Sequence, residues 1–506
     1  MRASRITVAL VAALTVLGVV LRLSLLGDSL VADELSTRWM ITAGGLWDVI
    51  AKVYSDAEIT PPLSFVLSWL TTRVELSNEL LRLPSLLAGA ATIPLVYAVG
   101  ARTVGARAAL LGTALTALSP FLLFYSTEAR SYALMILCLL CSTYALLRAV
   151  EDGRTRWWVA FGVATCAAMY SHYTSVFPLA AQLAWALWAH PAARRPALVA
   201  SAVAALAFAP WLPGLRGDMT SGTTEILSAL QPFTAGFVRT ALAHWVLAYP
   251  YGIDGAGIGD LPGVPALALL AAAVALGAAG LALRVLRERP RIEPGLVLIV
   301  ALAVAAPVGE ALVSAFGSNL FGTRNLAGSW PAMALCLSAL ILAAGPRLGV
   351  AAAALAVVAF AIGACKMLQP DFRRADFDGV AAQIVRESRP GDVVVDAAQI
   401  SPAGVPRALT VALGGARPIF DVGRDDVRYD PFRIAGLAPP PEQVLERAAS
   451  AARGHRMFLV VPADHPLATS TLDALPPGWR PVETRTFPGA NRLELVVAAD
   501  QTATGA

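Results

Sequence analysis

The sequence is short of charged residues. Only 15% of its 506 residues are Asp, Glu, Lys or Arg, against about 25% in a typical soluble protein, whereas 57% are hydrophobic. Mean hydropathy is +0.63. This balance excludes an ordinary soluble domain and predicts an α-helical polytopic membrane protein. The formal charge of +4 is spread over short basic groups between apolar runs, so we expect no nucleic-acid partner.

Cysteine and histidine are also scarce, with five of each. All the cysteines fall inside predicted spans, where disulfide exchange is not expected. They are Cys138, Cys141, Cys166, Cys336 and Cys365. No set of residues has the types and spacing of a zinc site, and no tandem repeat is evident. We therefore expect no required cofactor, and leave open a divalent ion bound among the acidic residues.

Long apolar runs are abundant. A spanning helix needs roughly 20 mostly apolar residues, and about eleven windows approach this length. These windows are 6–26, 82–101, 108–124, 131–149, 157–171, 173–190, 196–212, 263–284, 294–313, 326–344 and 348–366. Arg2 and Arg5 before the first window also fit a cleaved signal peptide, but we expect a retained first span, because only then does the topology close.

Arginines orient these spans, since basic residues concentrate in cytoplasmic loops. With the N-terminus inside, every inside segment is basic. The inside residues are Arg2, Arg5, Arg102, Arg107, Arg148, Arg154, Arg156, Arg194, Arg195, Arg284, Arg287, Arg289, Arg291 and Arg347. We therefore expect a multi-pass protein of the cytoplasmic (inner) membrane, with its long 27–81 loop and everything after 366 outside the cytoplasm.

Two domains are predicted. Residues 1–366 form the transmembrane domain, whose outer loop 27–81 includes the apolar stretch Pro61–Leu70, too short to span and expected to lie in the interface. Residues 367–506 form a small extracytoplasmic α/β domain, because charges and turn residues become frequent there. Its expected helices are Phe372–Glu387 and Pro441–Ala452, and its expected strands are Asp392–Ala397, Met457–Val461 and Leu493–Ala498. Ile226–Ala248, with Trp245, Tyr249 and Tyr251 near its end, fits either an amphipathic loop helix or an additional span.

Polar residues gather at the outer ends of the predicted spans. They are Asp33, Glu34, Glu58, Arg82, Glu128, Arg130, His172 and Arg324. Charged groups at membrane depth are costly and mark candidate functional sites. Taken singly, Asp33 and Glu34 fit a solvated loop pair or a helix N-terminal charge as well as they fit a functional site. Arg82 also fits a snorkelling side chain, and His172 fits a packed histidine. Their common side favours one shared site.

These residues lie in motifs that resemble those of GT-C glycosyltransferases that use polyprenyl-phosphate sugars, a group that includes protein O-mannosyltransferases and aminoarabinose transferases. The motifs are Asp33-Glu34, Glu58-x-Thr60-Pro61-Pro62-Leu63, Leu81-Arg82-Leu83-Pro84-Ser85, Tyr125-Ser126-x-Glu128-Ala129-Arg130-Ser131-Tyr132-Ala133, Tyr170-Ser171-His172-Tyr173 and Arg324-Asn325. The likeness is greatest over residues 30–190.

The resemblance implies a fold, a reaction and partners. The enzyme would transfer a sugar from a polyprenyl-phosphate donor to an acceptor hydroxyl at the outer membrane face, by inverting direct displacement. The acceptor would be an envelope glycan, lipid or protein. Asp33 would be the catalytic base, and Glu34 and Glu58 supporting carboxylates. Arg82, Arg130 and Arg324 would bind the donor phosphate, Tyr125, His172 and Tyr173 would line the sugar pocket, and Glu128 would hold Arg130.

The motifs depart from the family at two positions. Thr60 stands where relatives often have histidine, and Glu58 replaces an aspartate, which moves its carboxylate outward by about one methylene. Two other functions remain in view. A transporter or flippase of polyprenyl-linked sugars would also need many spans and buried charges, but such proteins commonly show internal repeats and charges near the bilayer midplane. A non-catalytic scaffold would not need clustered acids and arginines.

Overall fold

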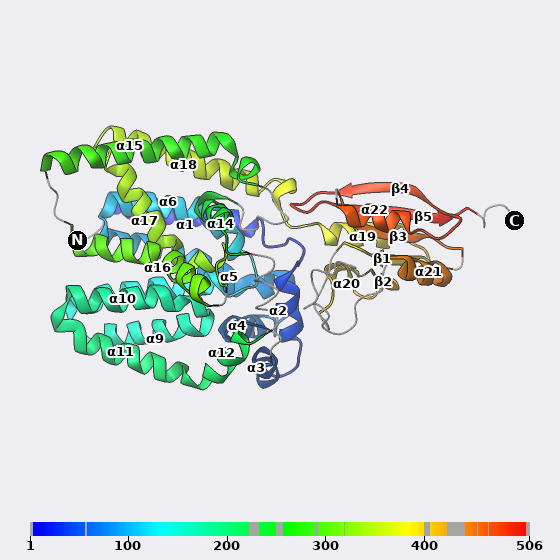
Figure 1. Ribbon diagram of the computed structural model, residues 1–506, viewed down its shortest axis with the longest axis horizontal. Coiled ribbons are helices and arrows are strands. Elements are labelled where there is room, and N and C mark those ends of the chain that lie inside the picture. The colour runs from blue at the N-terminus through cyan, green and yellow to red at the C-terminus, as the bar shows by residue number, and fades with distance from the viewer. Residues whose placement is uncertain are drawn as a thin grey trace. The chain divides into compact units, whose positions relative to one another are not determined.

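The computed structural model describes residues 4–55, 58–221, 232–248, 257–288, 292–317, 319–398, 405–422, 441–452, 454–463 and 465–501. By their internal contacts these residues form two compact units (Figure 1). The first comprises Met1–Leu26 and Met40–Leu368, and the second comprises Gly27–Trp39 and Gln369–Ala506. The expected division at residues 366 and 367 thus lies close to the end of the first unit, whereas the segment Gly27–Trp39, expected with the transmembrane domain, belongs to the second unit.

The first unit is helical throughout its described part. Its helices are α1 (Arg5–Leu23), α3 (Leu46–Tyr54), α4 (Leu63–Thr71), α5 (Asn78–Thr103), α6 (Ala106–Leu118), α7 (Pro120–Ser126), α8 (Tyr132–Asp152), α9 (Thr155–Ser171), α10 (Val176–Ala189), α11 (Arg194–Phe208), α12 (Leu212–Met219), α14 (Ala235–Leu247), α15 (Val264–Glu288), α16 (Pro294–Phe316), α17 (Trp330–Leu342) and α18 (Leu348–Met367). Short turns of helix join several of them, at η1 (Tyr173–Ser175), η2 (Pro191–Ala193), η3 (Ala209–Trp211), η4 (Gly259–Gly263) and η5 (Asn325–Ser329).

The predicted spans coincide with helices. Among the described residues, eight helices are long and apolar enough to cross a membrane, and the pair α6 and α7, bent by 59° at Ser119, counts as a ninth if it forms one span. The two remaining windows, 157–171 and 173–190, correspond to α9 and α10, which have 17 and 14 residues. The protein is therefore a multi-pass, mainly helical membrane protein.

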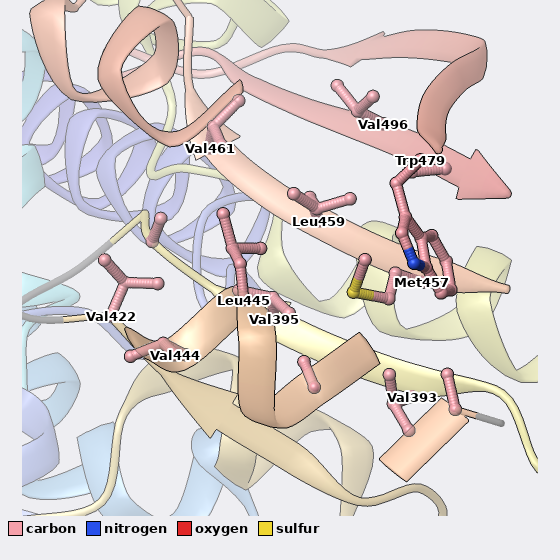
Figure 2. Packing of buried hydrophobic residues seen from close by; sticks show 14 of the residues in the cluster. Val393, Val395, Val422, Val444, Leu445, Met457, Leu459, Val461, Trp479 and Val496 are labelled. Atoms are coloured by element: carbon pink, nitrogen blue, oxygen red, sulfur yellow. The ribbon is translucent and has the colours of Figure 1, made fainter. Parts of the chain in front are cut away.

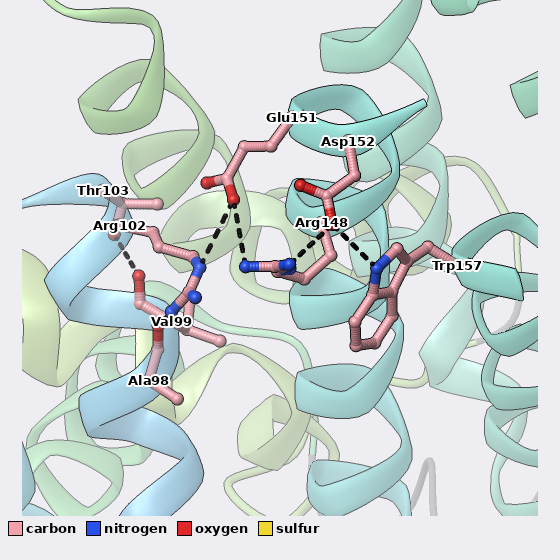
Figure 3. Close-up of polar contacts among 8 residues, drawn as sticks. All are labelled: Ala98, Val99, Arg102, Thr103, Arg148, Glu151, Asp152 and Trp157. Atoms are coloured by element: carbon pink, nitrogen blue, oxygen red, sulfur yellow. Dashed lines mark hydrogen bonds and ion pairs between the residues drawn. The ribbon is translucent and has the colours of Figure 1, made fainter. Parts of the chain in front are cut away.

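Helices α5 and α8 run in the same direction. The hydroxyl of Ser85, near the start of α5, donates to the backbone carbonyl of Arg130, two residues before α8. Arg102 at the end of α5 forms an ion pair with Glu151 at the end of α8. The two ends are about 30 Å apart, since an α-helix rises about 1.5 Å per residue. One end holds an exposed network that includes Arg148 and Asp152 (Figure 3). The other end holds the sequence-predicted site residues of this unit.

The loop 27–81 forms the expected short helices. Helices α3 and α4 each have nine residues, too few to span a bilayer. Helix α3 is amphipathic, burying Val49 and Val53 while exposing Trp47. The ambiguous stretch Ile226–Ala248 contains the 13-residue helix α14. Residues 226–231, Tyr249, Tyr251 and Asp56 lie outside the described residues.

The second unit contains a five-stranded sheet in the order β2-β1-β3-β5-β4. Its elements are α2 (Asp33–Ile41), η6 (Pro370–Phe372), α19 (Phe377–Glu387), β1 (Val393–Asp396), α20 (Ala408–Leu413), β2 (Ile419–Asp421), α21 (Pro441–Ala452), β3 (Met457–Pro462), α22 (Pro466–Asp473), β4 (Trp479–Phe487) and β5 (Leu493–Asp500). The last two residues of α2, Met40 and Ile41, belong to the first unit. Strands β2, β1 and β3 are parallel, whereas β3, β5 and β4 are antiparallel. The predicted α/β class is confirmed.

The strands that could be predicted from the sequence are those buried in the core of this sheet. Strands β1 and β3 are apolar runs buried along their length, as strands covered on both faces are. Leu459, Val395 and Leu445 of α21 meet in the core (Figure 2). Strand β4 was not expected, because it lies at the sheet edge with mostly exposed polar residues and a bulge after Pro481, and edge strands tolerate such composition.

Candidate functional site

The centre of the candidate site in the first unit is an ion pair between Glu58 and Arg130. Arg130 Nη1 donates to Glu58 Oε2 at 2.6 Å, and Nη2 donates to Oε1 at 2.9 Å, so the pair is bidentate. The side chains are only 6% and 8% exposed. An arginine–carboxylate fork of this geometry is among the stronger hydrogen-bonded pairs. The structure thus joins two predicted site residues that lie 72 positions apart.

Local structure fixes Arg130 in a tight turn. Pro120 begins α7, with Ser119 accepting from the backbone of Leu122 as its N-cap, and α7 ends at Ser126. The chain then turns before α8, where the backbone N–H of Arg130 donates to the carbonyl of Glu128 at 2.8 Å. Glu128 is buried, and the Ser85 hydroxyl donates to the carbonyl of Arg130 at 3.0 Å. Helix α5 therefore holds the turn that carries both charged residues.

A row of rings connects this turn to His172. Tyr125 and Tyr132 lie on either side of the turn, with ring centroids 4.7 Å apart. Tyr132 in turn lies 5.2 Å from the ring of His172. Tyr125 is 1% exposed and His172 is 6% exposed. The predicted residues Tyr125 and His172 thus share one buried aromatic cluster.

His172 is a neutral residue in this cluster. It lies between α9 and η1, outside the helices that qualify as spans, and the backbone N–H of Thr174 donates to its Nδ1 at 3.3 Å. Burial, together with the positive charges of Arg130 and Arg324, lowers the pKa of His172 to about 3. Nε2 therefore holds the ring proton at neutral pH and serves as a hydrogen-bond donor.

Arg324 lies at the same cluster, although it is far from the other members in sequence. It precedes η5, and Asn325 accepts at its carbonyl oxygen from the Thr174 hydroxyl at 3.4 Å. Arg324 is partly exposed, and its charge acts on His172. The predicted arginine outside the basic inner loops is therefore next to the predicted histidine, although 151 residues separate Thr174 from Asn325.

Tyr173 forms a polar group that sequence reasoning missed. Its hydroxyl donates to the carboxylate of Asp218 and accepts from Trp211 Nε1 at 2.9 Å. Asp218 is 7% exposed and Glu58 is close enough to Tyr173 to interact with it electrostatically. Trp211 is the second-last residue of the predicted span 196–212, and Asp218 follows six residues after its end, on the side predicted to be outside. Their position on the same predicted side of the membrane as the other candidate residues was the signal in the sequence that could have added them to the site.

Arg82 is the most deeply buried of the predicted arginines, with 0% exposure. Its Nη1 donates to the carbonyl of Leu26 at 2.7 Å, just after α1. Arg82 therefore joins α5 to the chain that leaves the first span.

Asp33 and Glu34 belong to the second unit. They are the first two residues of α2, a position where the helix dipole stabilises negative charge. Asp33 is partly exposed, whereas Glu34 is 1% exposed and its Oε2 lies 3.4 Å from Nε of Arg374. The two neighbouring acids thus have different surroundings: Asp33 is accessible, and Glu34 is held against an arginine.

No group of three or more potential metal ligands occurs among the residues that the structure describes. Thr60, at the position where relatives often have histidine, is buried next to Pro61 and Pro62. Chemically, the cluster of the first unit offers two guanidinium groups, a neutral imidazole donor and a tyrosine hydroxyl, beside carboxylates. Such groups suit an anionic ligand that carries hydroxyls.

Comparisons with known proteins agree with this chemistry. Residues 60–213 match the family model described as dolichyl-phosphate-mannose-protein mannosyltransferase. That range contains Arg82, Tyr125, Glu128, Arg130, His172 and Tyr173. No curated protein matches the chain in sequence.

Two solved structures are similar over most of the chain. The crystal structure of ArnT from Cupriavidus metallidurans bound to undecaprenyl phosphate is 14% identical, with a TM-score of 0.53, covering 98% of this chain and 98% of that one. The archaeal oligosaccharyltransferase AglB from Archaeoglobus fulgidus, in complex with an inhibitory peptide and a dolichol-phosphate, is 14% identical, with a TM-score of 0.49, covering 90% and 69%. The relationship predicted from the motifs is confirmed: residues 60–213 match the mannosyltransferase family, and the chain has the GT-C fold of ArnT.

Proposed function

We propose that this protein transfers a sugar from a polyprenyl-phosphate donor to an acceptor hydroxyl at the outer face of the cytoplasmic membrane. The observation that supports this most is the cluster of Arg130, Glu58, His172 and Arg324. Arg130 and His172 of this cluster lie within the segment matched by the mannosyltransferase family. The ArnT structure, which has the same fold, holds undecaprenyl phosphate. A polyprenyl-linked donor combines a lipid tail with an anionic phosphodiester, and membrane helices with buried arginines suit both parts.

In the proposed reaction the acceptor oxygen attacks the anomeric carbon as the bond from that carbon to the phosphate oxygen breaks. The acceptor proton passes to the carboxylate of Asp33, and polyprenyl phosphate leaves with the electron pair. Asp33 suits the role of base better than Glu34 because it is partly exposed, whereas Glu34 is enclosed with Arg374. Direct displacement by this route inverts the anomeric centre.

Arg130 and Arg324 are proposed to bind the phosphate, because a guanidinium stays charged and can bind two phosphate oxygens. Glu58 would hold Arg130 until the donor enters. His172, neutral at physiological pH, would donate from Nε2 to a sugar or phosphate oxygen, and Tyr173 would contact the sugar. Arg82, which donates to the carbonyl of Leu26, would bind the donor phosphate from a more deeply buried position.

The test is a reconstitution in lipid nanodiscs with a panel of polyprenyl-phosphate monosaccharides and acceptors. We expect release of polyprenyl phosphate together with a new glycoside. Asp33→Asn should lower the rate by about 10²–10⁴, the usual contribution of a general base. Asp48→Asn is the matched control, because this acid of the same loop caps the backbone of Gly45 at 2.8 Å.

Two outcomes would contradict the proposal. An undiminished rate in Asp33→Asn would show that another group removes the proton. Movement of the intact polyprenyl-linked sugar across proteoliposomes without any glycosidic bond would instead favour a transporter.

A further inference from the structure

The segment Gly27–Trp39 is attached to the C-terminal part of the chain by several polar contacts. Asp28 forms an ion pair with Arg373. The hydroxyl of Ser29 accepts from the backbone N–H of Asp378 at 2.9 Å, in the first turn of α19. These partners lie 345 and 349 residues apart in sequence, so chain connectivity does not account for the contacts.

Glu34, the neighbour of the proposed base, lies against Arg374. The distance from Glu34 Oε2 to Arg374 Nε is 3.4 Å, and the two side chains are 1% and 4% exposed. A carboxylate removed from water in this way needs its cation, since a buried charge without a partner is strongly unfavourable. Because Glu34 adjoins Asp33 in the first turn of α2, a displacement of Glu34 would also displace Asp33.

Arg374 is itself held by the sheet of the second unit. The turn between β4 and β5 reaches residues 373–375, where the backbone N–H of Ala490 donates to the carbonyl of Arg373 at 2.8 Å. Gly489 in this turn has a φ of +152°, and a Cβ there would lie 2.8 Å from Cα of Ala375. A glycine is required at this position, both for its backbone and for the close approach.

The backbone before α2 has a conformation that isolated chains seldom adopt. Ala32 has a φ of +47°, in the left-handed region that alanine rarely occupies. Such a residue persists where its surroundings hold it. The contacts on both sides of Ala32, at Ser29 and Glu34, are of the kind that supply this restraint.

We propose that the second unit is the scaffold of the catalytic base, and that Arg374 is a positioning residue that acts through Glu34 to fix Asp33. This inference rests on the proposed function, and it assigns Glu34 a positioning role. The C-terminal domain then contributes to catalysis by holding α2, and the carboxylate charge of Glu34 serves to pair with Arg374.

The kinetic test uses Arg374→Met in the full-length protein in nanodiscs. We expect kcat to fall at least tenfold while the KM for the polyprenyl-phosphate sugar changes less than twofold, because donor binding is assigned to residues of the first unit. Arg374→Lys should recover part of the lost rate. Arg485→Met is the matched control, since this exposed arginine of the same unit pairs with Glu387 and Glu483.

A double variant separates positioning from direct catalysis by Glu34. Adding Glu34→Gln to Arg374→Met removes the carboxylate charge that Arg374 balances, so we expect at least a tenfold gain in kcat over Arg374→Met alone. A double variant no better than the single one would overturn the proposal, because the Glu34 carboxylate would then be needed for itself.

Hydrogen exchange of the α2 backbone amides provides a readout that does not depend on activity. Exchange should be at least tenfold faster in Arg374→Met than in Arg485→Met, and Gly489→Ala should show the same direction of change. Equal exchange in all variants would refute the anchoring. If the wild-type protein transfers no sugar, the proposed function fails, and the exchange measurement still decides whether the second unit holds α2.

Discussion

Charged residues of both signs occur near both ends of α5 and α8, but in different surroundings. At one end Glu58 and Arg130 form a bidentate pair with 8% and 6% of their side chains exposed. At the other end Arg102 and Arg148 share Glu151, whose side chain is 42% exposed (Figure 3). Both ends pair arginine with a carboxylate, and the two ends differ in how far these side chains are buried. Exposed pairs are weak because water and salt screen them, whereas a buried pair persists against a large desolvation cost.

The largest effect is expected from Arg130→Met. The variant leaves Glu58 buried without its cation, which should lower the free energy of unfolding by about 3–5 kcal/mol. Sugar transfer should fall by about 10²–10³, the usual loss when one charge-stabilising group is removed. Denaturant unfolding in detergent and donor turnover measure the two effects.

A paired substitution separates stability from function at this end. Glu58→Leu combined with Arg130→Met removes both charges, so stability should return toward the wild-type value while transfer stays low. If Arg130→Met alone had the same unfolding free energy and the same transfer rate as the wild type, the buried pair would contribute no more to stability or transfer than the exposed network.

Smaller losses of stability and of sugar transfer are expected from Tyr173→Phe. The change removes the hydroxyl that donates to Asp218 and accepts from Trp211, at a cost of about 1–3 kcal/mol. Tyr170→Phe is the control, because the Tyr170 hydroxyl donates only to the Ala207 carbonyl on a more exposed face. Thermal unfolding and transfer assays should both rank Tyr173→Phe below Tyr170→Phe, and the reverse order would remove Tyr173 from the site.

Substitution of Asp392 tests whether every buried acidic residue of the protein takes part in sugar transfer. It is 2% exposed in the second unit and pairs with Arg456 at 2.9 Å. Burial opposes its ionisation, but hydrogen bonds from the backbone of Arg389 and Arg456 and the Arg456 charge outweigh this and hold the pKa of Asp392 below its ordinary value. Asp392→Asn should therefore lower stability at neutral pH and leave transfer unchanged.

The pH dependence of this effect follows from the sign of the shift. Since the folded protein releases the proton more readily than the unfolded chain, the stabilisation is present above the ordinary pKa of 3.8 and is lost as the pH falls below it. The difference in stability between wild type and Asp392→Asn should shrink between about pH 5 and pH 3. A difference that stayed constant over this range would show that Asp392 acts by packing.

The smallest effect is expected from Glu151→Gln at the exposed end. Loss of its contacts with Arg102 and Arg148 should change the free energy of unfolding by less than about 1 kcal/mol, and salt should reduce even this. Unfolding at low and high ionic strength measures it. A loss comparable to that of Arg130→Met would break the distinction between the two ends.

The sequence by itself determined the class of the protein and named most residues of the candidate site. Apolar length predicted the spans, because burying polar backbone in lipid leaves few alternatives to a helix. The predicted topology placed Arg130, His172 and Arg324 at span ends on one side, where costly charged groups favour a shared site. Strands β1 and β3 could also be predicted, since both are uninterrupted apolar runs.

Only the tertiary structure decided which charges are paired and which unit holds them. Nothing local indicates that Glu58 binds Arg130, that Tyr173 binds Asp218, or that Glu34 lies against Arg374, because such contacts depend on which distant elements pack together. Burial likewise decided that Asp33 is accessible and its neighbour Glu34 is not. Local patterns set the elements, and long-range packing set the charge environment on which the proposed chemistry depends.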